Sequence, residues 1–388
     1  MVTNLPAEAK AKFVKYMEAK TPEEKLKALE EFLSAVPKHK GTENLVRWIR
    51  KRMAELREEI EERKRKRSGS SGPSFFIEKE GAAQIILLGL TNVGKSSLLR
   101  ALTGARVEVS PYPYTTKIPV PGVLKYEDVD LQLVEAPAII PGGGGWNTKV
   151  AGLARNSDGL ALVVDLSEDP IEQLKEVASF LKSHGIHVVK PKGYVVIERG
   201  RGVTGIKVQL YGTLKCTIDE LRKLLESYRI YNAVVKIYGE VDLDLVEQAI
   251  FETITYKPTI IIANKLDAPN ADTNLRRLEK VVPSEIPIIP VSAINGSNLD
   301  SIGPTLFKKL ELIRIYTKPP LGEPSKKPLV LKRGATVLDV AKAIHSELYE
   351  KFAYARIWGP SAKYPGQRVG LNHVLEDGDI VEINIRRR

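Results

Sequence analysis

The most constraining feature of the sequence is residues 89–96, whose letters G-L-T-N-V-G-K-S match the phosphate-binding loop pattern G-x-x-x-x-G-K-[ST]. An apolar run of strand length, residues 85–88, precedes this segment, and an amphipathic run of helix-forming residues follows it. Glycines let a loop curl so that its N–H groups surround a phosphate, and the following helix adds its positive N-terminal end. The sequence therefore predicts a strand, a phosphate-binding loop and a helix in direct succession.

The residue types in this loop predict how it would hold a nucleotide. We expect Lys95 to reach the β- and γ-phosphates and the Ser96 hydroxyl to ligate Mg²⁺. The residues expected to contact the nucleotide here are Gly89, Leu90, Thr91, Asn92, Val93, Gly94, Lys95, Ser96 and Ser97.

From about residue 81 the chain alternates short apolar segments with helical ones, which is typical of an α/β fold with a mostly parallel sheet. The predicted strands cover residues 85–88, 131–135, 159–165, 259–263 and 288–291. Each ends at a loop with polar or glycine residues, where ligands bind in this architecture.

Two segments between these strands are candidates for sensing the γ-phosphate. The proline-rich loop at residues 110–122 carries Thr115 and Thr116, and we expect Thr116 to be the second Mg²⁺ ligand. Threonine pairs are common in loops, so the assignment of Thr116 depends on its place in sequence between the other motifs. The next strand delivers Glu135, Ala136, Pro137 and Ala138, where a GTPase normally carries Asp-x-x-Gly. Glu135 could still reach a Mg²⁺-bound water, whereas Ala138 keeps the N–H but loses the conformational freedom of glycine.

A guanine-recognition pattern follows the strand at residues 259–263. Asn264, Lys265 and Asp267 form N-K-x-D, and Ser292 and Ala293 follow the last predicted strand. We expect the Asp267 carboxylate to accept hydrogen bonds from N1–H and N2–H₂ of guanine, which adenine does not offer. Lys265 would pack along the base, and the Ala293 N–H would reach the guanine O6.

The rest of the chain predicts three further regions. Residues 7–67 predict helices, with one helix starting at Thr21 and Pro22 and two apolar stripes that indicate a hairpin. Residues 186–254 predict a small inserted α+β domain, and the C-terminal segment resembles a ubiquitin-like β-grasp. The predicted limits are 1–72 for the helical region, 80–185 with 255–318 for a discontinuous nucleotide domain, 186–254 for the insert and 325–388 for the C-terminal domain.

Composition bounds the partners and the compartment. The net charge of +11 in 388 residues indicates a polyanionic partner, with nucleic acid or a ribonucleoprotein ahead of a membrane surface, or else it only aids solubility. The basic residues 63–67 could contact phosphate or could be a solvated helix end. The lysines and arginines of the insert could face RNA, or the insert could be a rigid spacer. No window approaches the roughly 18 apolar residues of a membrane span, no signal peptide is evident, and Cys216 is the single cysteine, so we expect a cytoplasmic protein without a membrane partner.

Longer motifs resemble one family specifically. They are G-L-T-N-V-G-K-S-S, Y-P-Y-T-T followed by P-G-V, N-K-L-D, I-R-I-Y-T-K-P at residues 313–319, L-K-R-G-A-T-V at 331–337 and R-V-G-L-N-H-V-L-E-D-G-D at 368–379. Together they resemble the developmentally regulated GTP-binding proteins (DRG family), which are Obg-related, translation-associated GTPases, from about residue 42 onward. The resemblance implies GTP or GDP with Mg²⁺ as ligands, a helical hairpin, a G domain with an insert, a C-terminal TGS domain, association with ribosomes and, in eukaryotic members, a stabilising partner protein.

The resemblance also bears on catalysis. Ile139 and Ile140 fit the aliphatic residue that relatives place where many GTPases carry a water-orienting glutamine, which implies slow hydrolysis. Asn92 stands where potassium-activated relatives hold K⁺ against the phosphates, and K⁺ would supply positive charge there. The residues expected to act in catalysis are thus Lys95, Thr116 and Asn92.

The sequence therefore predicts a slowly hydrolysing GTPase whose nucleotide state governs docking to the ribosome or its RNA. One alternative is a binding protein that keeps GTP as a structural ligand, because Glu135 and Ala138 depart from the usual switch pattern. The other is an ATPase of the same superfamily, which the intact Asn264 and Asp267 disfavour.

Overall fold

A computed structural model describes residues 5–19, 21–37, 42–67, 75, 77–105, 118–140, 144–198, 204–251, 255–320 and 322–385. Contacts divide the chain into two units. The first comprises Met1–Ser74, Gly144–Arg155 and Leu181–Lys257, and the second comprises Phe75–Gly143, Asn156–Phe180 and Pro258–Arg388. Each unit is described by itself.

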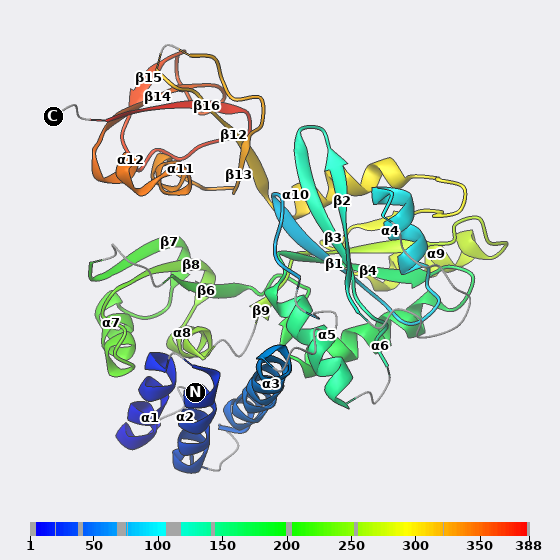
Figure 1. The fold of residues 1–388 in the computed structure, drawn as a ribbon, viewed down its shortest axis with the longest axis horizontal. Helices are drawn as coiled ribbons and strands as arrows, with labels where there is room; N and C mark the ends of the chain where they lie inside the picture. The colour runs from blue at the N-terminus through cyan, green and yellow to red at the C-terminus, as the bar shows by residue number, and fades with distance from the viewer. Residues whose placement is uncertain are drawn as a thin grey trace. The chain divides into compact units, whose positions relative to one another are not determined.

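The second unit contains a six-stranded sheet in the order β11-β10-β4-β1-β3-β2 (Figure 1). Its strands are β1 (Ala83–Leu88), β2 (Val120–Tyr126), β3 (Val129–Glu135), β4 (Gly159–Asp165), β10 (Thr259–Asn264) and β11 (Ile288–Pro290). All neighbours pair in parallel except β2 and β3, which are antiparallel. All five predicted strands are confirmed, and β2 adds an edge.

Helices complete this α/β layer. They are α4 (Lys95–Thr103), α6 (Pro170–Ser183), α9 (Ala271–Val281) and α10 (Ile302–Lys309), with a 3₁₀ turn at Leu299–Ser301. Leu98 and Leu99 of α4 and Leu306 of α10 are buried with strand residues such as Ile85 and Ile262. Strands β4 and β10 are nearly continuous apolar runs, because helices cover both faces of such a sheet.

The C-terminal part of the second unit is a five-stranded sheet in the order β13-β12-β16-β14-β15. Its strands are β12 (Leu312–Thr317), β13 (Leu329–Lys332), β14 (Phe352–Trp358), β15 (Gln367–Val369) and β16 (Asp379–Ile385), with helices α11 (Val337–Ile344) and α12 (Ser346–Glu350). Helices α11 and α12 are separate elements, because His345 between them is extended, with φ −166° and ψ 141°. The predicted β-grasp architecture is confirmed, and β12, which precedes the prolines at residues 319–324, belongs to this sheet.

The first unit joins the N-terminal helices to the inserted segment. It contains α1 (Ala7–Glu18), α2 (Pro22–Ala35), α3 (Glu43–Arg67), α5 (Gly144–Asn156), α7 (Ile218–Ser227) and α8 (Leu243–Ile250). Its strands are β6 (Gly193–Glu198), β7 (Ile206–Leu214) and β8 (Ala233–Val241), in the order β6-β8-β7, and the pair β5 (Ile186–His187) and β9 (Thr255–Tyr256). The two apolar stripes correspond to α2 and α3, and α1 precedes them. The Thr21 cap and Pro22 at the helix start are confirmed.

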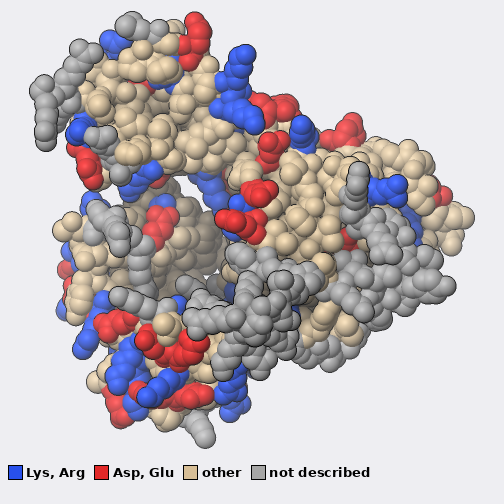
Figure 2. Space-filling model, viewed as in Figure 1, with Lys and Arg blue, Asp and Glu red and all other residues tan. Residues whose placement is uncertain are grey.

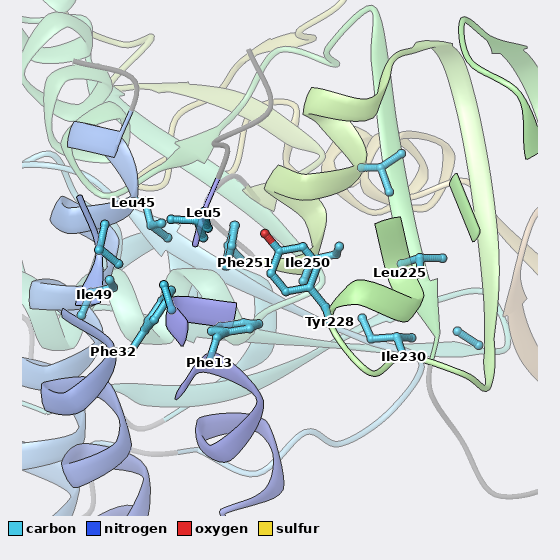
Figure 3. Packing of buried hydrophobic residues seen from close by; sticks show 14 of the residues in the cluster. Leu5, Phe13, Phe32, Leu45, Ile49, Leu225, Tyr228, Ile230, Ile250 and Phe251 are labelled. Carbon is cyan, nitrogen blue, oxygen red and sulfur yellow. The ribbon is translucent and has the colours of Figure 1, made fainter. Parts of the chain in front are cut away.

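An aromatic core holds the first unit together (Figure 3). The Phe13 ring of α1 lies 5.2 Å from that of Phe32 and 4.8 Å from that of Phe251. Buried Tyr228 packs edge-on against Phe13 and Phe251, and its hydroxyl donates a 2.6 Å hydrogen bond to Glu247. The N-terminal helices and the insert, distant in sequence, therefore share one core.

The surface of the N-terminal helices carries both signs of charge. Figure 2 shows lysine and arginine beside aspartate and glutamate over this region, so its visible face is not uniformly basic. Within the described ranges, no helix is both long enough and apolar enough to span a membrane.

Candidate nucleotide-binding site

The loop between β1 and α4 has a backbone shape that only glycine permits at two positions. Gly94, the residue before α4, has φ 89°, and a β-carbon there would lie 2.2 Å from Asn264 Nδ2. At Gly89 a β-carbon would lie 2.5 Å from the Val163 carbonyl oxygen. The two glycines of the motif therefore let the loop curl closely against β4 and β10.

Lys95 is held across this loop. Its ammonium donates hydrogen bonds to the carbonyl oxygens of Gly89, at 3.2 Å, and Leu90, at 2.6 Å. Burial lowers the pKa of Lys95 to about 8, although the nearby Glu135 carboxylate acts in the opposite direction. A phosphate placed beside the ammonium would favour its charged form further.

The rest of the loop divides between buried and exposed positions. Val93 is buried, whereas Asn92 is exposed at the tip with φ 60°, in the left-handed region that asparagine tolerates. The Thr91 hydroxyl lies 3.4 Å from Asn92 Oδ1. Ser97, in the first turn of α4, is partly buried.

The predicted metal-binding side chains Ser96 and Glu135 lie together. The Ser96 hydroxyl donates a 2.5 Å hydrogen bond to Glu135 Oε1, and Glu135 is 1% exposed. A hydroxyl beside a carboxylate is a set of oxygen ligands that suits Mg²⁺, so these residues fit that ion. Thr116, the other predicted ligand, lies outside the described residues.

The segment after β3 crosses the phosphate-binding loop. The Ala136 N–H donates to the Leu87 carbonyl oxygen at 3.1 Å, and the Ile139 N–H donates to that of Gly89 at 3.3 Å. Pro137 and Ala138 between them are buried. A switch segment in this position can respond to what the loop holds.

Asn264 connects the guanine-recognition pattern to the loop. Its Nδ2 donates to the Val93 carbonyl oxygen at 3.0 Å, and its Oδ1 accepts from the Ala293 N–H at 3.1 Å. Three segments far apart in sequence thereby meet at one side chain.

The remaining members of the pattern make polar pairs. Ser292, fully buried, donates its hydroxyl hydrogen to Oδ1 of the exposed Asp267. Lys265 has φ 64° and forms an ion pair with the Asp165 carboxylate. These pairs orient the Asp267 carboxylate and the Lys265 side chain.

Asp165 was not among the predicted site residues. It ends β4 directly opposite Asn264 in the sheet register, and it is 3% exposed. The available signal was a carboxylate at the carboxyl end of a predicted apolar strand. Its contact with Lys265 bridges two strands, so the carboxylate contributes to the position of that lysine.

The described residues thus combine the glycine-containing loop, the Ser96–Glu135 pair and the oriented Asp267 carboxylate at the carboxyl edge of the parallel strands. Parallel sheets bind ligands at this edge. Such an arrangement can hold the phosphates of a nucleotide at one end and read its base at the other.

Three family models match the chain. They are described as a 50S ribosome-binding GTPase over residues 84–196, the C-terminal region of that domain over 203–312, and a TGS domain over 313–385.

Curated relatives match nearly the whole chain. An uncharacterized GTP-binding protein of Methanocaldococcus jannaschii is 36% identical, covering 94% of this chain and 93% of its own length. Developmentally-regulated G-protein 3 of Arabidopsis thaliana is 32% identical, covering 93% and 98%. Ribosome-interacting GTPase 1 of Saccharomyces cerevisiae is 31% identical, covering 94% and 99%.

Proposed function

The chain belongs to the developmentally regulated GTP-binding protein family, and from that premise we propose that it is a Mg²⁺-dependent GTPase whose nucleotide state governs its binding to the ribosome or to ribosomal RNA. The observation that carries the proposal is the meeting of Gly94, Asn264 and Ala293 at one edge of the sheet. It supports a single site formed by the predicted phosphate and guanine segments.

The phosphate end of the site follows from the loop. The backbone N–H groups of residues 89–97 and the N-terminus of α4 would surround the phosphates, and Lys95 would leave its carbonyl partners to pair with them. Ser96 would ligate Mg²⁺ directly and Glu135 through a water, with Thr116 as the further ligand. Bound Mg²⁺ would offset negative charge on the β- and γ-phosphates.

The base end explains selectivity for guanine. Asp267, oriented by Ser292, would accept hydrogen bonds from N1–H and N2–H₂, and the Ala293 N–H would donate to O6. Lys265, held by Asp165, would cover the face of the base. Adenine would leave the carboxylate without donors, which disfavours its binding.

We propose that hydrolysis is slow and is stimulated by potassium. Ile139 and Ile140 occupy the region where a water-orienting glutamine would stand. The exposed Asn92 would help to hold a K⁺ against the phosphates, where the charge of the ion would stabilise the transition state.

The domain limits and the partners complete the proposal. The six-stranded sheet draws β1–β4 from before residue 186 and β10 and β11 from after residue 254, which supports a G domain formed around the insert by 80–185 and by the residues from 255 to the start of β12. The limits 1–72 are proposed for the helical region, and the TGS region is proposed to begin with β12, which pairs with β13 and β16. The name of the yeast relative and the net charge of +11 support a ribosomal partner, hence a cytoplasmic location, and a stabilising partner protein is part of the proposal.

Single-turnover hydrolysis of GTP by the purified protein tests this function. We expect turnover in potassium to exceed turnover in sodium, and ribosomes to raise the rate further. Equal rates in the two salts would remove the role given to Asn92. Tight GTP binding with no turnover under any condition would instead favour a binding protein with GTP as a structural ligand, for which Glu135 and Ala138 argue.

A further inference from the structure

The sheet of the first unit has one face packed in the core, and the residues on its other face are partly to largely exposed. Alternate residues of β6, β8 and β7 enter the core with the helices; they include Val195, Ile197, Val208, Val235 and Ile237. The residues between them point to the opposite side of the sheet. In the sheet register, Tyr194 of β6 and Tyr211 of β7 both lie opposite Tyr238 of β8.

These three residues, here called the tyrosine row, stack on one another across the strands. The Tyr194 and Tyr238 ring centroids are 4.6 Å apart with planes 8° from parallel, and those of Tyr211 and Tyr238 are 5.0 Å apart with planes at 11°. The ring centroid of Tyr256 lies 6.2 Å from that of Tyr194, with the planes tilted by 41°. At the other end, Tyr211 lies on β7, the edge strand, and is 51% exposed. The row therefore ends in an aromatic ring that faces solvent at the sheet edge.

Exposed lysines surround the tyrosine row. Lys207 lies on the same face of β7 as Tyr211, and Lys190 and Lys192 precede β6. The Lys190 ammonium lies 6.0 Å from the Tyr194 ring centroid. Two acidic groups partly offset these cations. Glu198 pairs at 2.7 Å with Lys236, which lies on the same face of β8 as Tyr238. Glu240 pairs with Lys215 at 2.6 Å and also interacts with Lys192. The balance of charge around the row suits a polyanion.

We propose that the tyrosine row binds an unpaired base of single-stranded RNA. The base would continue the stack on the outer face of Tyr211, and Lys207 and the lysines before β6 would contact the neighbouring phosphates. Stacking on tyrosine tolerates any base, because every base has a π-face, and it requires that the base be out of a duplex. The choice of RNA rests on the proposed ribosomal partner, whereas the stacking geometry does not.

The full-length protein and a labelled 12-nucleotide oligoribonucleotide test this site by fluorescence anisotropy, without GTP or ribosomes. We expect Tyr211→Ala to weaken binding about 5- to 150-fold, the range expected for loss of one stacked base. Tyr211→Trp should retain binding, because indole also stacks. Lys207→Ala should weaken binding modestly and lower its dependence on salt by about one phosphate contact.

Tyr231→Ala is the matched control, since Tyr231 is 57% exposed in the same unit and lies outside the row. It should bind RNA like the parent protein, and both tyrosine variants should bind GTP normally. Equal binding of the oligonucleotide and its duplex, or equal effects of the two alanine variants, would overturn the proposal. If the parent protein bound no free RNA but Tyr211→Ala lost ribosome binding, the RNA proposal would be overturned in favour of a protein partner at the β7 edge. None of these results depends on GTP turnover, so the GTPase proposal is tested separately.

Discussion

At the scale of single residues, the pair formed by Asp267 and Ser292 gives the sharpest test of base selectivity. We expect Asp267→Asn to weaken GTP binding by roughly 10- to 150-fold, since hydrogen bonds to a charged group contribute about 1.5–3 kcal/mol. The asparagine amide can donate to the C2 carbonyl of xanthine, so affinity for XTP should rise. Competition between GTP and XTP for the purified protein measures both effects.

Asp272→Asn is the control for this exchange, because Asp272 is an exposed carboxylate of the neighbouring helix α9. It should leave both affinities unchanged. If Asp267→Asn kept its preference for GTP over XTP, the carboxylate would not be the base-reading group.

Residues in the site could be predicted from the sequence where the motif letter itself carries the physical requirement. Gly94 must be glycine because its φ is 89° and Asn264 leaves no room for a β-carbon. Asp165 carries no such signal, since its role depends on a contact with Lys265 across two strands that the sequence separates by 100 residues. Only folding brings these two side chains together.

At the scale of elements, helix α7 depends on a capping box. The Thr217 hydroxyl accepts from the Glu220 N–H at 3.2 Å, and Glu220 Oε2 accepts from the Thr217 N–H at 2.8 Å. We expect Thr217→Ala to destabilise the helix by about 1 kcal/mol, because an N–H at the helix start loses its acceptor. Hydrogen exchange in the first turn of α7 should quicken about fivefold.

Thr217→Ser keeps the hydroxyl and should retain most of this protection. Protection in α2, which has its own capping box at Thr21, should not change in either variant. Equal exchange in the alanine and serine variants would show that the cap does not stabilise α7.

Elements could be predicted where the hydrophobic pattern is local. Strands β1, β4 and β10 of the large sheet are buried along their whole length and mostly apolar, and they were predicted together with β3 and β11. The extended conformation of His345 between α11 and α12 was not, because neither glycine nor proline marks it. The strand β12 was not predicted either. Its buried residues Ile313 and Ile315 alternate with Arg314 and Tyr316, but this alternation is shorter than the motif at residues 313–319 that contains it.

At the scale of the whole molecule, Arg314 of β12 connects the TGS sheet to the hairpin of β2 and β3. Its guanidinium donates to Asp377 Oδ2 at 2.8 Å and also pairs with Glu127 in the hairpin turn. Tyr316 donates a 2.5 Å hydrogen bond to Asp128 in the same turn. The hairpin ends at Glu135, beside Ser96, so one strand joins the candidate metal site to the contact with the TGS sheet.

The pKa of Asp377 predicts how this contact responds to acid. Burial acts to raise that pKa, but hydrogen bonds from Arg314 outweigh it and hold the pKa below the usual 3.8. The native state therefore binds fewer protons than the unfolded state, and the stabilisation is complete above about pH 4 and is lost as pH falls further. Hydrogen exchange of residues 312–317, corrected for its intrinsic dependence on pH, should quicken over that range.

Asp377→Asn imitates the protonated carboxyl group and should show faster exchange in this strand already at pH 7, with no further change in acid. Asp169→Asn removes a comparable partner, because Asp169 pairs with Arg277 on the surface at 2.9 Å, and it should leave residues 312–317 unaffected. If Asp377→Asn matched the parent protein at every pH, the backbone ladder of β12, which pairs with β13 and β16, would hold this junction without the carboxylate. If exchange of residues 312–317 quickened in Asp377→Asn but not in Asp169→Asn, the junction would be assigned to the Arg314 ion pair. The β2–β3 hairpin would then be joined to the TGS sheet by charge.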